Sequence, residues 1–377
     1  MKGYRILAMA RKEVLQIRRD ARSLGIVVLM PIIMMLIFGY GVSFDTKHIP
    51  VYVFDRDSTQ ASVDLLKHFQ ASDYFNVVRS VDNYRDLTAA VDSGACQLGI
   101  VIPPGFSAAV HSGGQTSVQA IVDGTDANTA NVAMSYAQAI VRGYAQQAQI
   151  NWIRKRTPTP ANLPLSVETR TWFNEDLVSL ATIVPGVIVM VMAVVGTFLT
   201  SLTIAREWER GTMEQLISTP IHPLEIMLGK LGPYVVIGML DTTVCAAMGV
   251  LWFGVPFRGQ VSVFLFSSFL FLCVVLSLGY FISIIAKTQL AASQAALLST
   301  FLPAFLLSGF IFPIDQMPIV VQWITHIVPA RYYMAILRAV FLKGSSVVFL
   351  WSDLIALLVF ATFLVLVATR AFKKKLA

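Results

Sequence analysis

Two long stretches of this chain contain no charged residue, and they constrain its fold more than any other feature. One runs from residue 23 to 44 and the other from residue 177 to 205. A helix needs about 20 consecutive apolar residues to cross the hydrocarbon core of a bilayer. Four more apolar segments are of suitable length, so the sequence predicts a polytopic α-helical membrane protein. Its six transmembrane helices are expected near residues 24–43, 179–204, 231–254, 261–285, 289–311 and 347–369.

The net charge of +7 is distributed unevenly along the chain. Residues 44–177 hold 10 Lys/Arg and 13 Asp/Glu, a net charge of −3, so the positive charge belongs to the apolar remainder. Basic residues beside apolar helices set membrane topology. This distribution favours a lipid partner and gives no indication of nucleic-acid binding.

The basic residues also predict which way the chain is oriented. Seven Lys/Arg lie in residues 1–22, four in the tail 370–375 and three in the loop 205–230, with Lys287 between two later helices. The connections on the other side offer only Arg258, Arg331, Arg338 and Lys343. The positive-inside rule therefore places both termini in the cytosol, as in a multi-pass protein of a bacterial inner membrane.

This topology divides the chain into four parts. Residues 1–22 are expected to form an amphipathic helix on the cytosolic membrane surface, although a basic topology signal without fixed structure remains the alternative. Residues 23–43 form the first transmembrane helix. Residues 44–177 alternate strand-like and helix-like runs, which predicts an inserted extracytoplasmic α/β domain that serves in docking or gating. Residues 178–377 carry the other five helices.

The sequence offers no residues for a metal site or for catalysis. Cys96 is the one cysteine of residues 44–177, so that domain cannot close an internal disulfide. The five histidines are scattered and none has metal-ligand spacing with a cysteine. No Gly-x-x-x-x-Gly-Lys-[Ser/Thr] phosphate loop occurs, so the chain is not expected to bind ATP in that way or to act as an enzyme by itself.

The loop 205–230 contains the most distinctive short stretch of the chain, residues 206–220. Thr212 is suitably placed to cap a short helix that Pro220 would end. An amphipathic helix with acidic and aromatic side chains suits contact with a partner protein, while an ordinary solvated loop is the other interpretation.

Residues 206–220 resemble the loop after the second helix in membrane subunits of ABC transporters of the type-2 permease family. A second match lies near the other end of the chain, in the segments 307–313, 317–318, 329–333 and 342–344 together with Arg338. Layout and spacing agree over nearly the whole chain, and the large insert after the first helix is similar to that of the long bacterial exporter-type members.

The resemblance implies a permease subunit of an ATP-driven exporter that moves a hydrophobic or amphiphilic substrate outward. A cytosolic ATPase subunit, which holds the ATP and Mg²⁺, would dock on the helix after the second span. A second copy or a sister permease would complete the membrane core, and a periplasmic adaptor is a further possible partner. The residues implied in ATPase coupling are Arg206, Glu207, Glu209, Gly211, Thr212, Glu214, Leu216 and Pro220.

Two further groups of residues are candidates for the transport path. Asp241 is the one acid deep in a predicted span, and such a residue is a functional candidate by default, although a polar lock between helices explains it as well. Met34 and Met190 offer soft apolar contacts to a substrate, or fill space against lipid. The segment 312–345 is expected to form an outer re-entrant lid. Its residues, with the exit of the fifth helix, are Gly309, Phe310, Pro313, Pro318, Tyr332 and Arg338.

Other functions remain open at this point. An ion-driven secondary transporter would need several intramembrane acids or repeated broken helices, and only Asp241 qualifies. A non-transporting, ATPase-coupled subunit that signals across the envelope would carry the same cytosolic loop. An intramembrane enzyme would need a catalytic constellation, which the sequence does not offer.

Overall fold

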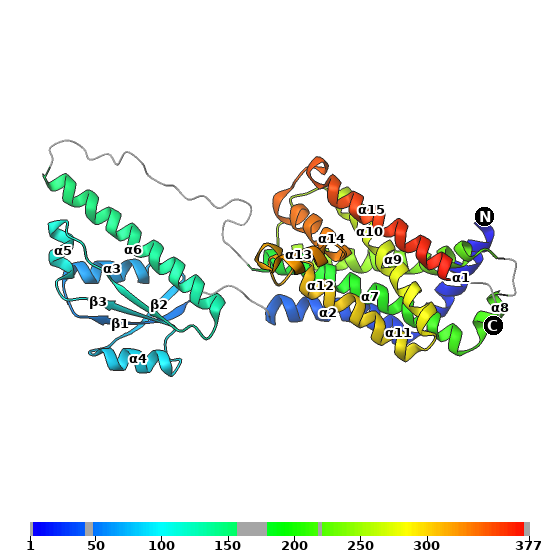
Figure 1. Ribbon diagram of the computed structural model, residues 1–377, viewed down its shortest axis with the longest axis horizontal. Helices are drawn as coiled ribbons and strands as arrows, with labels where there is room; N and C mark the ends of the chain where they lie inside the picture. The colour runs from blue at the N-terminus through cyan, green and yellow to red at the C-terminus, as the bar shows by residue number, and fades with distance from the viewer. Residues whose placement is uncertain (1–2, 42–47, 157–178, 218–220, 373–377) are drawn as a thin grey trace. The chain divides into compact units, whose positions relative to one another are not determined.

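The computed structural model describes residues 3–41, 48–156, 179–217 and 221–372. The chain divides into two compact units (Figure 1). One consists of Met1–Ser43 with Thr171–Ala377, and the other of Phe44–Arg170.

The first unit is a bundle of apolar helices. Within its described residues, five helices are long and apolar enough to cross a membrane. They are α7 (Leu180–Glu209), α9 (Pro223–Leu251), α10 (Val261–Ala286), the continuous run of α11 (Gln289–Ala296), η1 (Leu297–Phe301) and α12 (Leu302–Leu307), and α15 (Val347–Ala371). The prediction of a polytopic helical membrane protein is therefore confirmed. Where the first of six spans was expected, α2 (Ala21–Gly41) contains a shorter apolar helix, Val27–Gly41.

Helix α7 is the core of this bundle. Nearly every side chain from Ala181 to Ala205 is buried, and α7 packs against α2, α9, α10 and α11 (Figure 1). Small residues permit the closest approach. A Cβ atom at Gly279 of α10 would lie 2.5 Å from the carbonyl oxygen of Thr197, so the two helices touch through backbone there. Such close contacts are typical of helix pairs in membranes.

Helix α9 begins eight residues before the predicted residue 231. His222 caps it, accepting a hydrogen bond from the Leu224 amide at 3.3 Å, while Glu225 accepts one from the His222 amide at 3.1 Å. Pro223 stands at the first helical position, where its missing N–H costs nothing. Two other helices are neighbours of α9. The short helix α8 (Thr212–Ile217) precedes it in the chain. Helix α1 (Gly3–Arg19) packs on α9 in space.

The segment before α15 is a set of short helices. These are η2 (Ile314–Gln316), α13 (Ile319–Thr325), α14 (Pro329–Arg338) and η3 (Ala339–Lys343). Helix α14 packs against α7, α10, α12 and α15, so this helix is covered by protein, whereas α13 exposes Ile319, Val320 and Trp323. Irregular backbone can exist at membrane depth when it is covered in this way.

The second unit contains a four-stranded sheet in the order β2-β1-β3-β4. Strand β1 (Ile49–Asp55) pairs in parallel with β2 (Phe75–Ser80) and β3 (Leu98–Ile102), while β4 (Gln119–Val122) is antiparallel to β3. Figure 1 shows α3 (Gln60–Gln70), α5 (Phe106–Ser112) and α6 (Ala127–Arg156) over one face and α4 (Tyr84–Asp92) over the other. Strand β3 is buried at every position, as expected of a central strand covered on both faces.

Candidate functional site

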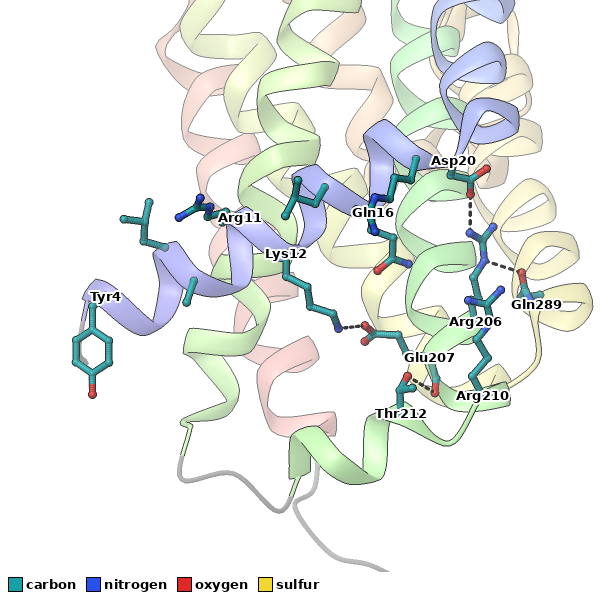
Figure 2. Close-up of a pocket in the computed structure, with 14 residues that line it drawn as sticks. Tyr4, Arg11, Lys12, Gln16, Asp20, Arg206, Glu207, Arg210, Thr212 and Gln289 are labelled. Atoms are coloured by element: carbon teal, nitrogen blue, oxygen red, sulfur yellow. Dashed lines mark hydrogen bonds and ion pairs between the residues drawn. The ribbon is translucent and has the colours of Figure 1, made fainter.

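A large open cleft lies at the end of the helical bundle where α7 finishes (Figure 2). Its volume is about 1180 Å³, and its walls come from α1, the last turn of α7, the first residue of α8 and the first residue of α11. We call it the α1–α7 cleft. Both α1 and the end of α7 contribute charged groups to it, and Tyr4, Leu7 and Leu15 of α1 provide apolar side chains.

Helix α1, which forms one wall of the cleft, has one face buried in the bundle and another face exposed. Met9 and Glu13 are buried against the bundle, whereas Tyr4 and Leu7 are 64% and 72% exposed. Gly229 of α9 allows this packing, because a Cβ atom there would lie only 2.6 Å from Cβ of Met9. Helix α1 is therefore seated directly on α9 through one face and leaves apolar side chains on the other.

A tight turn between α7 and α8 forms the floor of the cleft. Gly211 has φ +68°, a left-handed conformation that glycine adopts without steric cost. The Thr212 hydroxyl donates a hydrogen bond to the carbonyl oxygen of Glu207 at 3.3 Å. Met213 is fully buried and anchors the start of α8 to the bundle. The turn thus fixes the direction in which α8 leaves α7.

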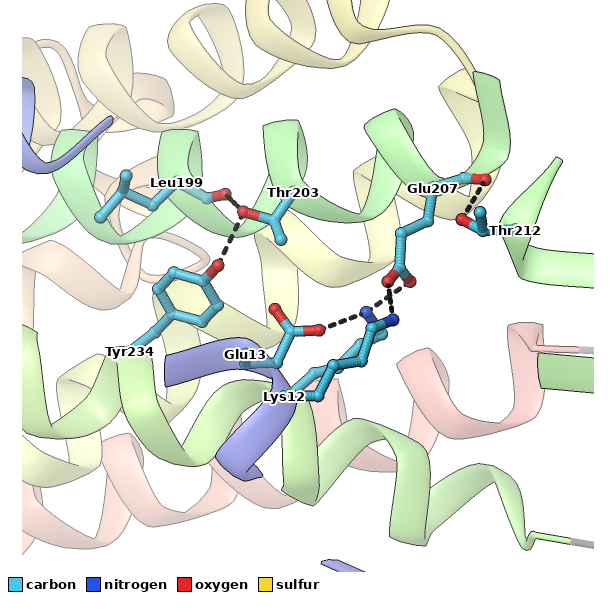
Figure 3. Close-up of polar contacts among 8 residues, drawn as sticks. Lys12, Glu13, Leu199, Thr203, Glu207, Thr212 and Tyr234 are labelled. Carbon is cyan, nitrogen blue, oxygen red and sulfur yellow. Dashed lines mark hydrogen bonds and ion pairs between the residues drawn. The ribbon is translucent and has the colours of Figure 1, made fainter. Parts of the chain in front are cut away.

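Beside the cleft lies an ion cluster of four residues, which we call the buried ion cluster: Lys12, Glu13, Glu207 and Lys230 (Figure 3). Lys12 Nζ is 2.7 Å from Oε1 of Glu207, and Lys230 Nζ is 2.7 Å from Oε1 of Glu13 and also contacts Oε2 of Glu207. Two cations and two anions make the cluster neutral. Its members come from α1, α7 and α9, so it ties three helices together.

A second polar link joins α7 to the start of α11. Arg206 Nη1 is 2.5 Å from Oδ2 of Asp20, and Arg206 Nε donates a hydrogen bond to Oε1 of Gln289 at 3.2 Å. The carboxylate of Glu209 accepts hydrogen bonds from the backbone amide of Gln289 at 2.7 Å and from its side-chain amide. The end of α7 is therefore connected to helices on both sides of the cleft.

Comparison with known proteins agrees with this architecture. The family model described as "ABC-2 family transporter protein" matches residues 23–370, which is nearly the whole chain. The chain belongs to the ABC-2 transporter family. It is 39% identical over 343 residues to "Probable multidrug ABC transporter permease YbhS" of Escherichia coli strain K12, which covers 90% of this chain and 89% of that protein.

Two more ABC-2 relatives from Escherichia coli strain K12 match over similar lengths. "Probable multidrug ABC transporter permease YbhR" is 29% identical over 359 residues, covering 94% of this chain and 95% of that protein. "Inner membrane transport permease YhhJ" is 28% identical over 334 residues, covering 86% and 85%. The chain is accordingly the membrane subunit, or permease, of an ABC exporter.

The structure places the residues implied in ATPase coupling in two different environments. Glu207 is buried in the ion cluster and faces α1 and α9, whereas Glu209 and Gly211 are exposed at the end of α7. Arg206 is half-buried between Asp20 and Gln289. Glu214 and Leu216 belong to α8, but the structure describes no side chain for either, and Pro220 lies outside the described residues.

The sequence reasoning missed the partners of these residues. Lys12 is 195 residues from Glu207, and Lys230 is 217 residues from Glu13, so neither pairing has a local signal. Two signals existed for single members. Lys230 stands at the start of an apolar run, and Glu13 is one of two acids in a strongly basic segment. Isolated charges of this kind usually need a partner when they are buried.

The candidates for the transport path do not meet in one cavity. Asp241 lines a small cavity between α7, α9 and α10, together with Gly196, Gly238 and Leu272. Met34 is half-buried on α2 and Met190 is buried in the centre of α7, and neither lines that cavity. Among the described residues, Asp241 is thus set apart from the methionines named with it.

Three of the six residues expected in the outer lid come together. Arg338 at the end of α14 donates a hydrogen bond from Nη2 to the carbonyl oxygen of Gly309 at 2.5 Å. Gly309 has φ +83°, which turns the chain so that Phe310 enters the bundle. Pro313 and Pro318 precede η2 and α13, and the Tyr332 hydroxyl donates to the His326 carbonyl oxygen at 3.0 Å.

Proposed function

We propose that this ABC-2 permease exports a hydrophobic or amphiphilic compound and that the α1–α7 cleft receives its cytosolic ATPase subunit. The observation that carries this proposal is the cleft itself. It is open, it is larger than the 300–1,000 Å³ typical of small-molecule pockets, and it combines charged with apolar walls. A surface of this kind suits a protein partner.

The charges of the cleft indicate the chemistry of that partner. Lys12 is paired with Glu207, and Arg206 with Asp20. Three more exposed cations, Arg11, Arg19 and Arg210, remain on the lining, so the cleft is positive overall. An acidic and partly apolar surface of the ATPase would complement it.

The same charges support the proposed topology. The cleft and the basic segment 1–22 lie on one side of the bundle, which we place in the cytosol with both termini. We take α2 as the sixth span, and Phe44–Arg170 as an inserted α/β domain on the periplasmic side of the inner membrane. The outer lid would then be the segment that contains α13 and α14.

A second copy or a sister permease would complete the transport path. The core helix α7 is buried within this chain, whereas α9, the α11–α12 run and α15 expose many large apolar side chains. These faces suit lipid and a second subunit. The ATP and Mg²⁺ would be held by the ATPase subunits. The names of YbhS and YbhR suggest multidrug substrates, which agrees with an apolar helix bundle as the path.

Charge reversal in the cleft tests the docking assignment. Arg11→Glu with Arg210→Glu should weaken binding of the cognate ATPase about tenfold, because two attractive contacts become repulsive. The amount of ATPase that co-purifies with the permease from membranes, its retention, measures this binding. Arg142→Glu, an exposed substitution on α6, is the matched control and should leave retention unchanged. Unchanged retention in the double variant would remove the cleft as the docking site.

A further inference from the structure

Three of the four residues of the buried ion cluster are almost completely removed from solvent. The side chains of Glu13 and Lys230 are 0% and 1% exposed, and that of Glu207 is 5% exposed. Lys12, at 46%, and the largely buried Glu207 both line the α1–α7 cleft. The cluster therefore has two members on the cleft and two, Glu13 and Lys230, inside the bundle.

A buried ion cluster by itself contributes little to the stability of the folded protein. Burying charges costs solvation free energy, and well-packed apolar residues of similar volume often stabilise a protein as much or more. The apolar contact between Met9 and Gly229 already seats α1 on α9. What the ion pairs add is a fixed geometry: Lys230 of α9 is held by one carboxylate from α1 and one from α7.

The place of the cluster along the chain links the cleft to two spans. Glu207 lies on the last turn of α7, four residues before the Gly211 turn into α8. Lys230 lies on α9, eleven residues before Asp241 on the same continuous helix. A rigid displacement of α1 would therefore act on both spans through the same four side chains.

We propose that the ion cluster is the joint that transmits movement at the cleft to spans α7 and α9, with Glu13 and Lys230 as positioning residues that act through Glu207. This inference rests on the proposed docking of the ATPase at the cleft. It predicts that breaking the cluster uncouples transport from ATP hydrolysis, while the ATPase remains bound and active.

The decisive measurement is the amount of substrate transported per ATP hydrolysed, with the assembled complex in liposomes. Lys230→Met removes both inner pairs and should lower this ratio about tenfold, within the range of coupling between distant sites. Lys230→Arg keeps a cation between the carboxylates of Glu13 and Glu207. It should retain most of the coupling that Lys230→Met loses.

A second variant and a control guard against simple misfolding. Lys12→Met breaks only the pair nearest the cleft, where the side chain is half-exposed, and should lower the ratio to a smaller extent. Lys67→Met, which breaks the exposed ion pair with Asp64 on α3, should leave the ratio unchanged. A purely structural role would lower transport and ATP hydrolysis in the same proportion and leave their ratio constant.

The outcomes separate the two proposals. If Arg11→Glu with Arg210→Glu leaves the ATPase bound, the docking site is wrong. If docking is confirmed but Lys230→Met and Lys12→Met keep the wild-type ratio, or Lys230→Arg lowers it as much as Lys230→Met, the joint is wrong.

Discussion

Phe310 occupies the space that a side chain on Gly186 would need. A Cβ atom at Gly186 of α7 would come within 1.9 Å of Cδ2 of Phe310, which is buried at the exit of α12. The ring also stands 6.5 Å from that of Phe38 on α2 and 6.3 Å from that of Phe305. Phe310 therefore joins the proposed outer lid to the core helix through a position that only glycine allows.

Replacing Gly186 by a larger residue should displace Phe310 from its place against α7. Gly186→Leu cannot be accommodated unless Phe310 leaves, and overpacking of this kind destabilises a core by about 1–3 kcal/mol. Thermal unfolding in detergent should show the loss. Phe310→Ala in the same background should return part of the stability, because the new side chain then has space. Equal stability of Gly186→Leu and the wild type would contradict the close contact.

The turn at Gly211 gives a second prediction. Its φ of +68° is a left-handed conformation, which costs an L-residue about 1–2 kcal/mol. Gly211→Ala should therefore displace α8 and lower ATPase retention. Gly232→Ala is a matched control, because it lies inside α9 with no atom within 4 Å of its Cβ and should be neutral or slightly stabilising. Retention of the ATPase and the unfolding temperature measure the two effects.

Regular patterns made much of the helical bundle predictable. The apolar stretch expected at 261–285 corresponds to α10 (Val261–Ala286), and the one at 347–369 to α15 (Val347–Ala371). Prediction failed where polar residues continue a helix. Glu207 and Glu209 extend α7 past the expected residue 204, because their carboxylates find partners on α1, α9 and α11. Partners so distant in the chain leave no periodic signal.

Local signals also explain what was found and missed in the sheet unit. The apolar run at 98–102, which two prolines follow, is a local signal for a strand and coincides with the bounds of β3. Helix α5 was not predicted, because it has only seven residues between Gly105 and Gly113 and depends on contacts with α3 and α6. The π-helical turn η1 inside the fifth apolar stretch was likewise not foreseen, since nothing in its sequence, Leu-Leu-Ser-Thr-Phe, distinguishes it from an ordinary α-helical turn.

The pH dependence of the sheet unit should involve Asp57. Its carboxylate accepts hydrogen bonds from the Thr59 hydroxyl at 2.6 Å and from the amides of Gly105 and Ser107 at 2.8 and 2.9 Å. These bonds, the Thr59 bond foremost, lower the pKa of Asp57. A lowered folded-state pKa gives stability that is present above the unfolded pKa, about 3.9, and is lost as the pH falls through the folded value.

Asp57→Asn should therefore destabilise the protein at neutral pH and reduce its further loss of stability on acidification. Unfolding temperatures between pH 7 and pH 3 measure both effects, with Asp92→Asn on the exposed face of α4 as the control. Parallel curves for Asp57→Asn and the wild type would show that the Asp57 bonds contribute nothing to acid sensitivity.

Asp241 provides a test between ATP-driven and ion-driven transport. Its Oδ2 atom is buried and has no hydrogen-bond partner among the described residues, and it lies beside a cavity lined by Gly196 and Gly238. An unpaired intramembrane carboxyl would be the proton carrier of an ion-driven transporter.

In an ABC exporter the energy comes from the ATPase, so Asp241→Asn should preserve transport of a neutral amphiphile in liposomes supplied with ATP. Collapse of the proton gradient at constant ATP should also leave that transport unchanged. Thr243→Val, an exposed neighbour on α9, controls for changes in the helix itself. Loss of transport in Asp241→Asn together with loss on gradient collapse would identify an ion-driven carrier, because no ATPase step requires that carboxyl.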